Sequence, residues 1–312
     1  MDASGKPGTL YLVATPIGNL EDITLRALRV LKESDLIAAE DTRRTRKLLS
    51  HYGISKPLVS CFEENEQKRI PLLLESLRAG KSVALVSDAG SPGVSDPGYR
   101  LVQALLREGI PFTAVPGPSA VITALSLAGL PANHFSFYGF LPRTRSERLR
   151  FLEQAARQSS ALVFFESPRR IASSILEMLK VFGNRQAALC RELTKRFEEV
   201  HRGTIAEIIE KIERKPPKGE LCLVVAGARP QEEAEVRREE ALHKVEKELD
   251  RYRQEGRSVK EAALTLARQY GLSRREVYQM ALGKPPHAQS GARGLPGCDE
   301  REEDCSPEGL EK

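Results

Sequence analysis

Residues 87–98 read SDAGSPGVSDPG; they follow the apolar run 83–86 and precede a helical pattern that ends at Gly109. Three glycines, two prolines and two aspartates in twelve residues predict a loop of special turns, whose backbone amides face a ligand at the carboxyl end of a strand. An ordinary strand-to-helix connection is shorter, so we interpret this loop as a ligand site, with a plain surface loop as the alternative.

The two aspartates of this loop receive different interpretations. Asp96 directly precedes Pro97, a pair typical of a helix N-cap and first turn, so we assign Asp96 a capping role. No such role accounts for Asp88. A carboxylate at the tip of a parallel strand can accept a hydrogen bond from a ribose hydroxyl or an amino group, and we therefore expect Asp88 to contact the ligand.

Strand-like runs alternate with helical patterns along residues 8–116. This alternation predicts an α/β lobe with a parallel sheet, whose loops meet at one edge. The four loops that we expect there are residues 15–20, 40–46, 87–98 and 116–120. The first loop has one glycine where a dinucleotide fingerprint needs three, and no loop ends in GK[ST], so pyrophosphate binding is disfavoured.

The remainder of the chain predicts three further segments. Four more strand-like runs, spaced by helical patterns, indicate a second α/β lobe over residues 117–228. Residues 229–285 combine a charged helical pattern, interpreted as a solvated face or spacer, with helix-turn-helix spacing at Ala267, Gly271 and Val277. Capping boxes mark the two helix starts of that motif, at Ser258 with Glu261 and at Ser273 with Glu276. Residues 286–312, rich in proline, glycine and acidic residues, are expected to be disordered.

Composition excludes several classes of protein. Of the 312 residues, 40% are hydrophobic and 29% are charged, which is typical of a soluble globular protein. No apolar run reaches the length of a bilayer and no export signal is visible, so we expect a cytoplasmic protein without a membrane partner. The five cysteines and five histidines lack the spacing of metal sites, and no metal is expected.

Several long motifs together resemble one known family. The strings LVATPIGNLEDIT, AEDTRRTRKLL, VSDAGSPGVSDPGYRLV, PGPSAVITALSLAGLP, FYGFLPR, FFESPRR and CRELTKRFEE occur in this order. They closely resemble the ribosomal small-subunit methyltransferase I family, a branch of the tetrapyrrole methylase superfamily. The resemblance implies a two-domain class III methyltransferase fold, a homodimer, and S-adenosylmethionine bound between the domains. The implied substrate is the ribose 2′-hydroxyl of a cytidine in the decoding region of 16S rRNA, within the small ribosomal subunit.

The resemblance also implies which residues contact the cofactor. They are Pro16, Gly18, Asp88, Ala89, Gly90, Ser91, Pro92, Ser119, Ala120, Phe165, Glu166, Leu193, Gly219 and Glu220. The sequence departs from the corrin branch, in which the acid lies inside a GDP loop rather than ahead of AGSP, so the partner of each cofactor atom is left open. For Glu166 a solvent-exposed strand terminus is an equal alternative.

Methyl transfer to a hydroxyl requires positioning and a proton acceptor. The displacement at the methyl carbon is in line, and much of its rate can come from that alignment. Four side chains on the expected loops are candidate bases for the hydroxyl proton: Glu40, Glu192, Asp41 and Lys195. Glu40 and Glu192 are favoured. Asp41 could instead be the N-cap of the helix beginning at Thr42, and Lys195 qualifies only if burial depresses its pKa.

Arginine clusters indicate the class of substrate. They follow the expected strand ends and include Arg43, Arg44, Arg46, Arg143, Arg145, Arg148, Arg169, Arg170 and Arg191. Arg274 and Arg275, with Lys284, lie on the second helix of the helix-turn-helix. Such clusters are typical of phosphate-backbone binding, and Phe140 or Phe62 could stack a base. Two alternatives stay open: a tetrapyrrole C-methyltransferase, since a macrocycle with many carboxylates also suits arginines, and a non-enzymatic ligand-sensing regulator that binds nucleic acid.

Overall fold

The computed structural model describes residues 6–228, 230–254 and 258–282. The chain divides into a compact unit over Met1–Pro230 and a second unit over Gln231–Lys312. Lys284 and the tail predicted over residues 286–312 lie outside the described residues. Within the described part of the chain, every helix is too short or too polar to span a membrane.

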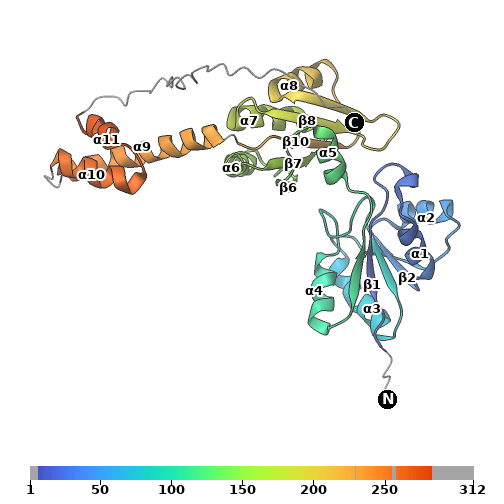
Figure 1. The fold of residues 1–312 in the computed structure, drawn as a ribbon. Helices are drawn as coiled ribbons and strands as arrows, with labels where there is room; N and C mark the ends of the chain where they lie inside the picture. Colours follow the sequence, from blue (N-terminus) through green and yellow to red (C-terminus); the bar gives the residue numbers. More distant parts are fainter. Residues whose placement is uncertain (1–5, 229, 255–257, 283–312) are drawn as a thin grey trace, which may run out of the picture. The chain divides into compact units, whose positions relative to one another are not determined.

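The first unit begins with a five-stranded parallel sheet, to which β1 and β2 in Figure 1 belong. The order of its strands is β3-β2-β4-β1-β5. Its strands are β1 (Leu10–Val13), β2 (Leu36–Ala39), β3 (Leu58–Ser60), β4 (Val83–Val86) and β5 (Phe112–Val115). The parallel sheet predicted from the sequence is confirmed. Strand β4 is central and buried along its whole length, so residues 87–98 leave the middle of the sheet at its carboxyl edge.

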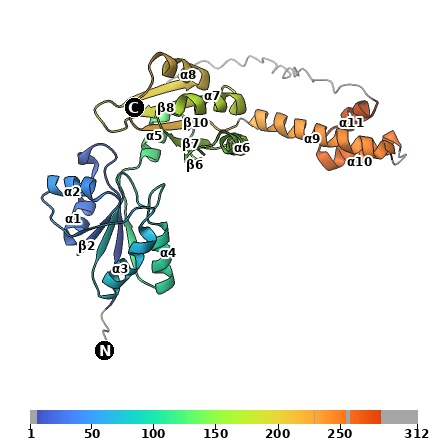
Figure 2. The same ribbon diagram turned by 180° about the vertical axis from the view of Figure 1, so that it is seen from behind.

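Two pairs of helices cover the faces of this sheet. Helices α1 (Leu25–Glu33), preceded by the short 3-10 helix η1 (Leu20–Asp22), and α2 (Thr42–His51) pack on one face. Helices α3 (Glu66–Arg78) and α4 (Tyr99–Glu108) pack on the other, as both views show (Figures 1 and 2). The inward-facing leucines at helical spacing, Leu73, Leu77, Leu101 and Leu105, are completely buried. Each such side chain contributes about 1.5–3 kcal/mol of burial free energy.

A second five-stranded sheet, in the order β6-β7-β10-β8-β9, completes the first unit. Its strands are β6 (Phe135–Phe140), β7 (Ala161–Glu166), β8 (Gln186–Arg191), β9 (Glu199–Thr204) and β10 (Leu221–Val225). Only the β6–β7 pair is parallel; the other three pairs are antiparallel. The second α/β segment therefore differs from the first in topology, and the division at residue 116 stays a proposal because both sheets belong to one compact unit.

Helices cover both faces of the second sheet. Helices α6 (Arg145–Ala155), α7 (Ile171–Phe182) and α8 (Ile205–Arg214) enclose a core that contains the fully buried Phe164. Helix α5 (Ala120–Ala128) packs on the opposite face, together with Ile17 from the loop after β1. The loops at the carboxyl edge of the first sheet thus meet an apolar face of the second sheet.

The described residues of the second unit form three helices, α9 (Pro230–Gln254), α10 (Val259–Tyr270) and α11 (Arg274–Ala281). The capping box predicted for Ser273 and Glu276 is confirmed. At Ser258 the structure shows one half of the predicted box, in which the hydroxyl accepts a hydrogen bond from Glu261 N. Gly271 ends α10 with a φ of 66°, the left-handed conformation that favours glycine, and Ala267 and Val277 are buried.

Helix α9 is not the solvated spacer that its charge pattern predicted. Val245 and Leu249 are buried in one cluster with residues of α10 and α11. An ion pair between Arg238 of α9 and Glu276 adds a polar contact at the start of α11. The predicted helix pair is therefore part of a three-helix unit with its own hydrophobic core.

Candidate active site

The loop over residues 87–98 is joined to the loop that follows β1. Gly90 N donates to Thr15 O at 3.0 Å, and Thr15 N donates to Gly90 O at 2.9 Å. The Thr15 hydroxyl donates to Ser87 O at 3.0 Å. Gly90 adopts a φ of 82°, which a residue with a Cβ rarely adopts, so this connection depends on glycine.

Asp96 is not the N-cap of α4, contrary to the sequence prediction. The helix begins at Tyr99, and its N-cap is Gly98, which has no side chain to accept a hydrogen bond. Glu66, at the start of α3, supplies the missing acceptor: its Oε1 accepts from Gly98 N at 3.1 Å and from Leu101 N at 3.0 Å. The Asp96 carboxylate is therefore available for another role.

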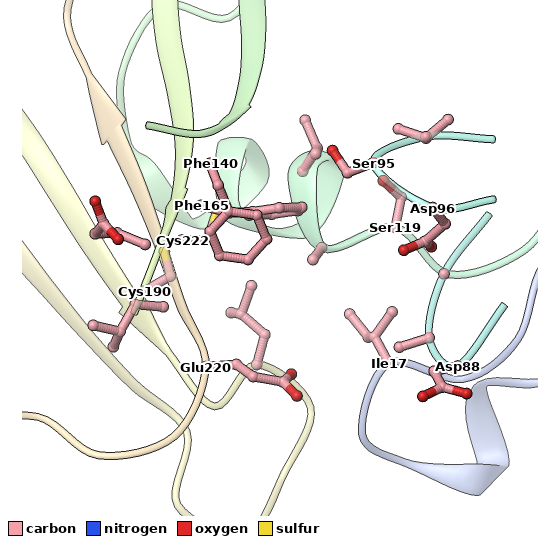
Figure 3. Close-up of a pocket in the computed structure, with 18 of the residues that line it drawn as sticks. Ile17, Asp88, Ser95, Asp96, Ser119, Phe140, Phe165, Cys190, Glu220 and Cys222 are labelled. Carbon is pink, nitrogen blue, oxygen red and sulfur yellow. The ribbon is translucent and has the colours of Figure 1, made fainter. Parts of the chain in front are cut away.

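A cavity of about 440 Å³ lies between this loop and the second sheet (Figure 3). Most residues that the family resemblance assigned to the cofactor line it: Asp88, Ala89, Gly90, Ser91, Ser119, Ala120, Phe165, Glu166, Leu193, Gly219 and Glu220. Glu40 and Arg44 line it as well. Loops that are far apart along the chain thus meet at one cavity, as the sequence predicted.

Three predicted cofactor residues, Pro16, Gly18 and Pro92, are not among the described residues that line the cavity. Gly18 has a packing role instead, because a Cβ at this position would lie 2.4 Å from Lys195 Cγ and 2.9 Å from Leu193 O. Glycine therefore lets the loop after β1 approach the loop after β8, and Ile17 and Leu193 of these two loops both line the cavity.

Other lining residues were not predicted from the sequence. They are Ile17, Val94, Ser95, Asp96, Val121, Ser167, Pro168, Cys190, Leu221 and Cys222. Cys190 and Cys222 lie opposite each other in the antiparallel register of β8 and β10, which no local motif reveals. Phe140, considered above only as a base-stacking residue, also lines the cavity and is 60% exposed.

Glu40 and Asp88 connect the ends of β2 and β4. Asp88 N donates to Glu40 Oε2 at 3.0 Å, and Asp41 N donates to Asp88 Oδ1 at 3.0 Å. Arg44 pairs with the second Asp88 oxygen at 3.2 Å. Both carboxylates face the cavity while they also fix the two loops in position.

Asp41 acts as a helix cap, the alternative that its sequence position allowed. Its Oδ1 accepts from Arg43 N at 2.8 Å, which caps α2, and its Oδ2 pairs with Arg43 Nη2 at 2.7 Å. The hydrogen bonds from Arg43 hold the pKa of the Asp41 carboxyl well below its usual range. A strongly acidic carboxylate outside the cavity is a poor candidate for the base.

Glu192 and Lys195 form an ion-pair cluster beside the cavity. Glu192 Oε1 accepts from Lys195 Nζ at 3.0 Å and from Glu220 N at 2.9 Å, and Lys195 also pairs with Glu220. Burial lowers the pKa of Lys195, but its hydrogen bonds to Glu192 and Glu220 outweigh that effect and raise it. The depressed pKa required of a lysine base is therefore contradicted, and the engaged Glu192 is a weaker candidate than the sequence indicated.

Glu166 is buried, so the interpretation of a solvent-exposed strand terminus is wrong. Its oxygens accept from Ser167 N at 2.8 Å and from the Ser174 hydroxyl at 2.8 Å, and Arg170 pairs with it at 3.1 Å. These partners fix the end of β7 at the cavity wall.

Asp96 is a carboxyl group of the cavity that the sequence prediction missed. Burial, together with the nearby Glu40 and Asp88 carboxylates, raises the pKa of Asp96 to about 6, and a hydrogen bond with Ser87 opposes this rise. Carboxyl groups with such raised pKa values are common among catalytic acids and bases. The only sequence signal was a second aspartate in the same glycine- and proline-rich loop, and the capping interpretation concealed it.

The predicted arginines fall into two groups. The first group forms ion pairs or hydrogen bonds within the first unit and comprises Arg148, Arg170 and Arg191. Arg148 pairs with Glu177 at 2.6 Å, and Arg170 donates to Leu141 O at 2.7 Å. The expected role of Arg170 in RNA binding is therefore corrected to a structural one. The exposed group comprises Arg43, Arg44, Arg46, Arg143, Arg145 and Arg169, together with Arg274 and Arg275 at the start of α11.

Comparison with known sequences places the chain among methyltransferases. A family model described as tetrapyrrole (corrin/porphyrin) methylases matches residues 9–209. The ribosomal RNA small subunit methyltransferase I of Halalkalibacterium halodurans is 46% identical over 273 residues, which cover 88% of this chain and 94% of that protein. The protein of the same name from Thermotoga maritima is 50% identical over 220 residues, which cover 70% of this chain and 99% of the relative.

Solved structures show the same fold at lower identity. The methyltransferase CobJ superposes with a TM-score of 0.56 at 20% identity, covering 71% of this chain and 95% of CobJ. A uroporphyrin-III C-methyltransferase from Thermus thermophilus, solved with S-adenosyl homocysteine, gives a TM-score of 0.51 at 24% identity, covering 70% of this chain and 96% of that structure. These likenesses confirm the predicted tetrapyrrole methylase-like α/β fold.

Proposed function

Because the chain belongs to the tetrapyrrole (corrin/porphyrin) methylase family, and within it to the ribosomal RNA small subunit methyltransferase I family, we propose that it transfers a methyl group from S-adenosylmethionine to ribosomal RNA. The observation that carries the proposal is the acidic and partly apolar cavity bordered by exposed arginines of α2. The relatives with the rRNA name set the substrate class.

The cavity suits S-adenosylmethionine in size and charge. Its volume of about 440 Å³ falls within the range of small-molecule sites. A sulfonium and an ammonium group are both positive, and the carboxylates of Glu40 and Asp88 supply a complementary negative field. Ile17 and Phe165 provide apolar contact for an adenine ring. When bound, the cofactor supplies an electrophilic methyl group.

We propose the ribose 2′-hydroxyl of a cytidine in the decoding region of 16S rRNA as the acceptor. Such a hydroxyl must be held in line with the methyl carbon, which requires the RNA backbone to be fixed beside the cavity. Arg44 lines the cavity itself, and Arg43 and Arg46 are exposed on the same helix, so phosphate groups can be bound at this edge. The macromolecular context that we propose is the small ribosomal subunit in the cytoplasm, with the enzyme acting as a homodimer.

The test is transfer of labelled methyl from S-adenosylmethionine to three acceptors in parallel: purified small subunits, naked 16S rRNA and uroporphyrinogen. The modified nucleoside is then identified by mass spectrometry. Label in 2′-O-methylcytidine is the expected result. Label in the macrocycle would support the tetrapyrrole alternative, and absence of label from all three acceptors would support a ligand-sensing regulator.

A further inference from the structure

The proposed reaction requires a group that takes the proton of the ribose hydroxyl. Asp96 lines the cavity on the wall formed by residues 87–98, and Figure 3 shows it across the cavity from Phe140 and Phe165. We propose, on the basis of the proposed function, that the Asp96 carboxylate is this proton acceptor. A base must lie within hydrogen-bond reach of its substrate proton, and a side chain on the cavity wall meets that condition once the ribose enters.

The other carboxylates of the cavity are engaged by strong partners. Glu40 accepts from the Asp88 backbone N–H, and Asp88 is paired with Arg44. Glu166 is held by Arg170 and by the Ser174 hydroxyl, and Glu220 is paired with Lys195. An arginine, a lysine or a backbone N–H stabilises the ionised form and makes the carboxylate a weaker base. Among the described residues, no cation pairs with Asp96.

The backbone holds Asp96 in a defined position. Ser95 has a φ of 62°, uncommon for a residue with a Cβ, and Pro97 restricts the backbone on the other side. Glu66 fixes the following Gly98 and Leu101 through two backbone hydrogen bonds. Backbone strain of this kind often occurs at functional sites, where the surrounding structure maintains it.

The electrostatic surroundings suit a base near neutral pH. The charged groups around Asp96 are Glu40 at the end of β2, Asp88 at the end of β4 with its partner Arg44, and Glu66 at the start of α3. Burial is the largest cause, and with the Glu40 and Asp88 carboxylates it raises the pKa of Asp96 to about 6. The carboxyl group is therefore mostly ionised at pH 7.5, yet it is a stronger base than an ordinary aspartate.

The proposed step balances in atoms and charge. The ribose 2′-oxygen forms a bond to the methyl carbon while the carbon–sulfur bond of the sulfonium donor breaks, and that electron pair stays on sulfur. The hydroxyl proton passes to an Asp96 oxygen. Water then accepts this proton and restores the carboxylate. Products are the 2′-O-methyl ribose, the neutral thioether and one released proton.

The experiment compares Asp96→Asn with the matched control Asp35→Asn. Asp35 directly precedes β2, is exposed and accepts hydrogen bonds from Ser82. Single-turnover transfer to small subunits should fall about 10²–10⁴-fold in Asp96→Asn and stay unchanged in the control. Calorimetric binding of S-adenosylhomocysteine should stay within about twofold of wild type in both, since loss of a base does not remove cofactor contacts.

A pH profile of wild-type kcat/KM gives a second, independent readout. The rate should fall about tenfold per pH unit below a midpoint near 6, because protonated Asp96 cannot accept a proton. Asp96→Glu should recover part of the Asp96→Asn loss. Three results would each overturn the assignment. They are an Asp96→Asn variant that transfers methyl at the wild-type rate, a flat wild-type profile between pH 5 and 7, and a loss of S-adenosylhomocysteine binding in Asp96→Asn as large as its loss of activity. Failure of the wild-type enzyme to methylate rRNA would instead refute the proposed function.

Discussion

At the scale of single residues, the arginines of this chain show that charge in a sequence does not reveal its partner. Arg148 belongs to a cluster that predicted a phosphate-binding surface, yet its guanidinium is buried against the Glu177 carboxylate. Arg143, only five residues earlier, has an exposed side chain. The two arginines are identical in the sequence pattern and differ only through their tertiary environment.

Because of this difference, the same substitution should affect stability at Arg148 and RNA binding at Arg143. Arg148→Met should lower the free energy of unfolding by about 3 kcal/mol, because it leaves Glu177 buried without its closest cation. Arg143→Met should change the free energy of unfolding by less than about 0.5 kcal/mol. It should, however, reduce the slope of log affinity for rRNA against log salt concentration by about one, because one phosphate contact is lost. Urea unfolding and filter binding at several salt concentrations measure these effects. Equal stability of both variants would contradict the buried ion pair.

At the same scale, the sequence predicted the site better than the roles within it. Asp88, Gly90 and Ser119 line the cavity as expected, because a loop after a buried strand can be located from local pattern alone. Asp96 was misassigned because Asp-Pro is a valid local capping signal. The acceptor that actually serves α4 is Glu66, which lies 32 residues away from Gly98 and could not be identified without the fold.

At the scale of elements, the start of α4 therefore depends on α3. Glu66→Ala should lower the free energy of unfolding by about 2–3 kcal/mol, because two buried N–H groups lose a charged acceptor. Asp96→Ala should not destabilise the protein at pH 7.5, since its carboxylate caps nothing and burial disfavours its charged form. Denaturant unfolding of both variants checks the comparison. A larger loss in Asp96→Ala would restore the capping role to that residue.

Strands β3 and β9 carry a weak signal in the sequence for a related reason. Strand β3 has three residues, and β9 reads EVHRGT, in which most side chains are partly exposed. Both lie at the edge of their sheets, where one side of the strand has no partner strand. Edge strands need little apolar character, so their sequences carry weak periodicity, whereas the buried β4 and β10 were recognisable from continuous apolar runs.

At the scale of the whole molecule, the alternation of strands and helices predicted both lobes but not the topology of the second sheet. Antiparallel pairing of β7, β10 and β8 depends on which strands become neighbours, and a run such as LCLVV fits either direction. The helix-turn-helix was predicted more fully, because caps and a left-handed glycine are local signals. The packing of α9 against this helix pair was not predicted, because a strongly charged helix can still bury a few apolar residues such as Val245.

The separate cores of the two units predict that cofactor binding does not need the second unit. Among the residues that the structure describes, all that line the cavity lie between Ile17 and Cys222, inside the first unit. The Thermotoga maritima relative is covered to 99% by a match of 220 residues, so that protein is too short to carry a counterpart of this whole chain. A chain that ends at Pro230 should therefore bind S-adenosylhomocysteine within about twofold of the full-length protein.

RNA affinity should respond differently to the same truncation. Removal of Arg274 and Arg275 together with the second unit should weaken binding to small subunits and reduce its salt dependence, because fewer phosphate contacts release fewer counterions. The matched control is the full-length Arg274→Gln/Arg275→Gln variant, in which the buried core of α9, α10 and α11 is kept. If truncation weakens RNA binding and the double variant does not, the second unit contributes through another surface. Loss of S-adenosylhomocysteine binding in the truncated chain would show instead that the first unit depends on the second for its fold.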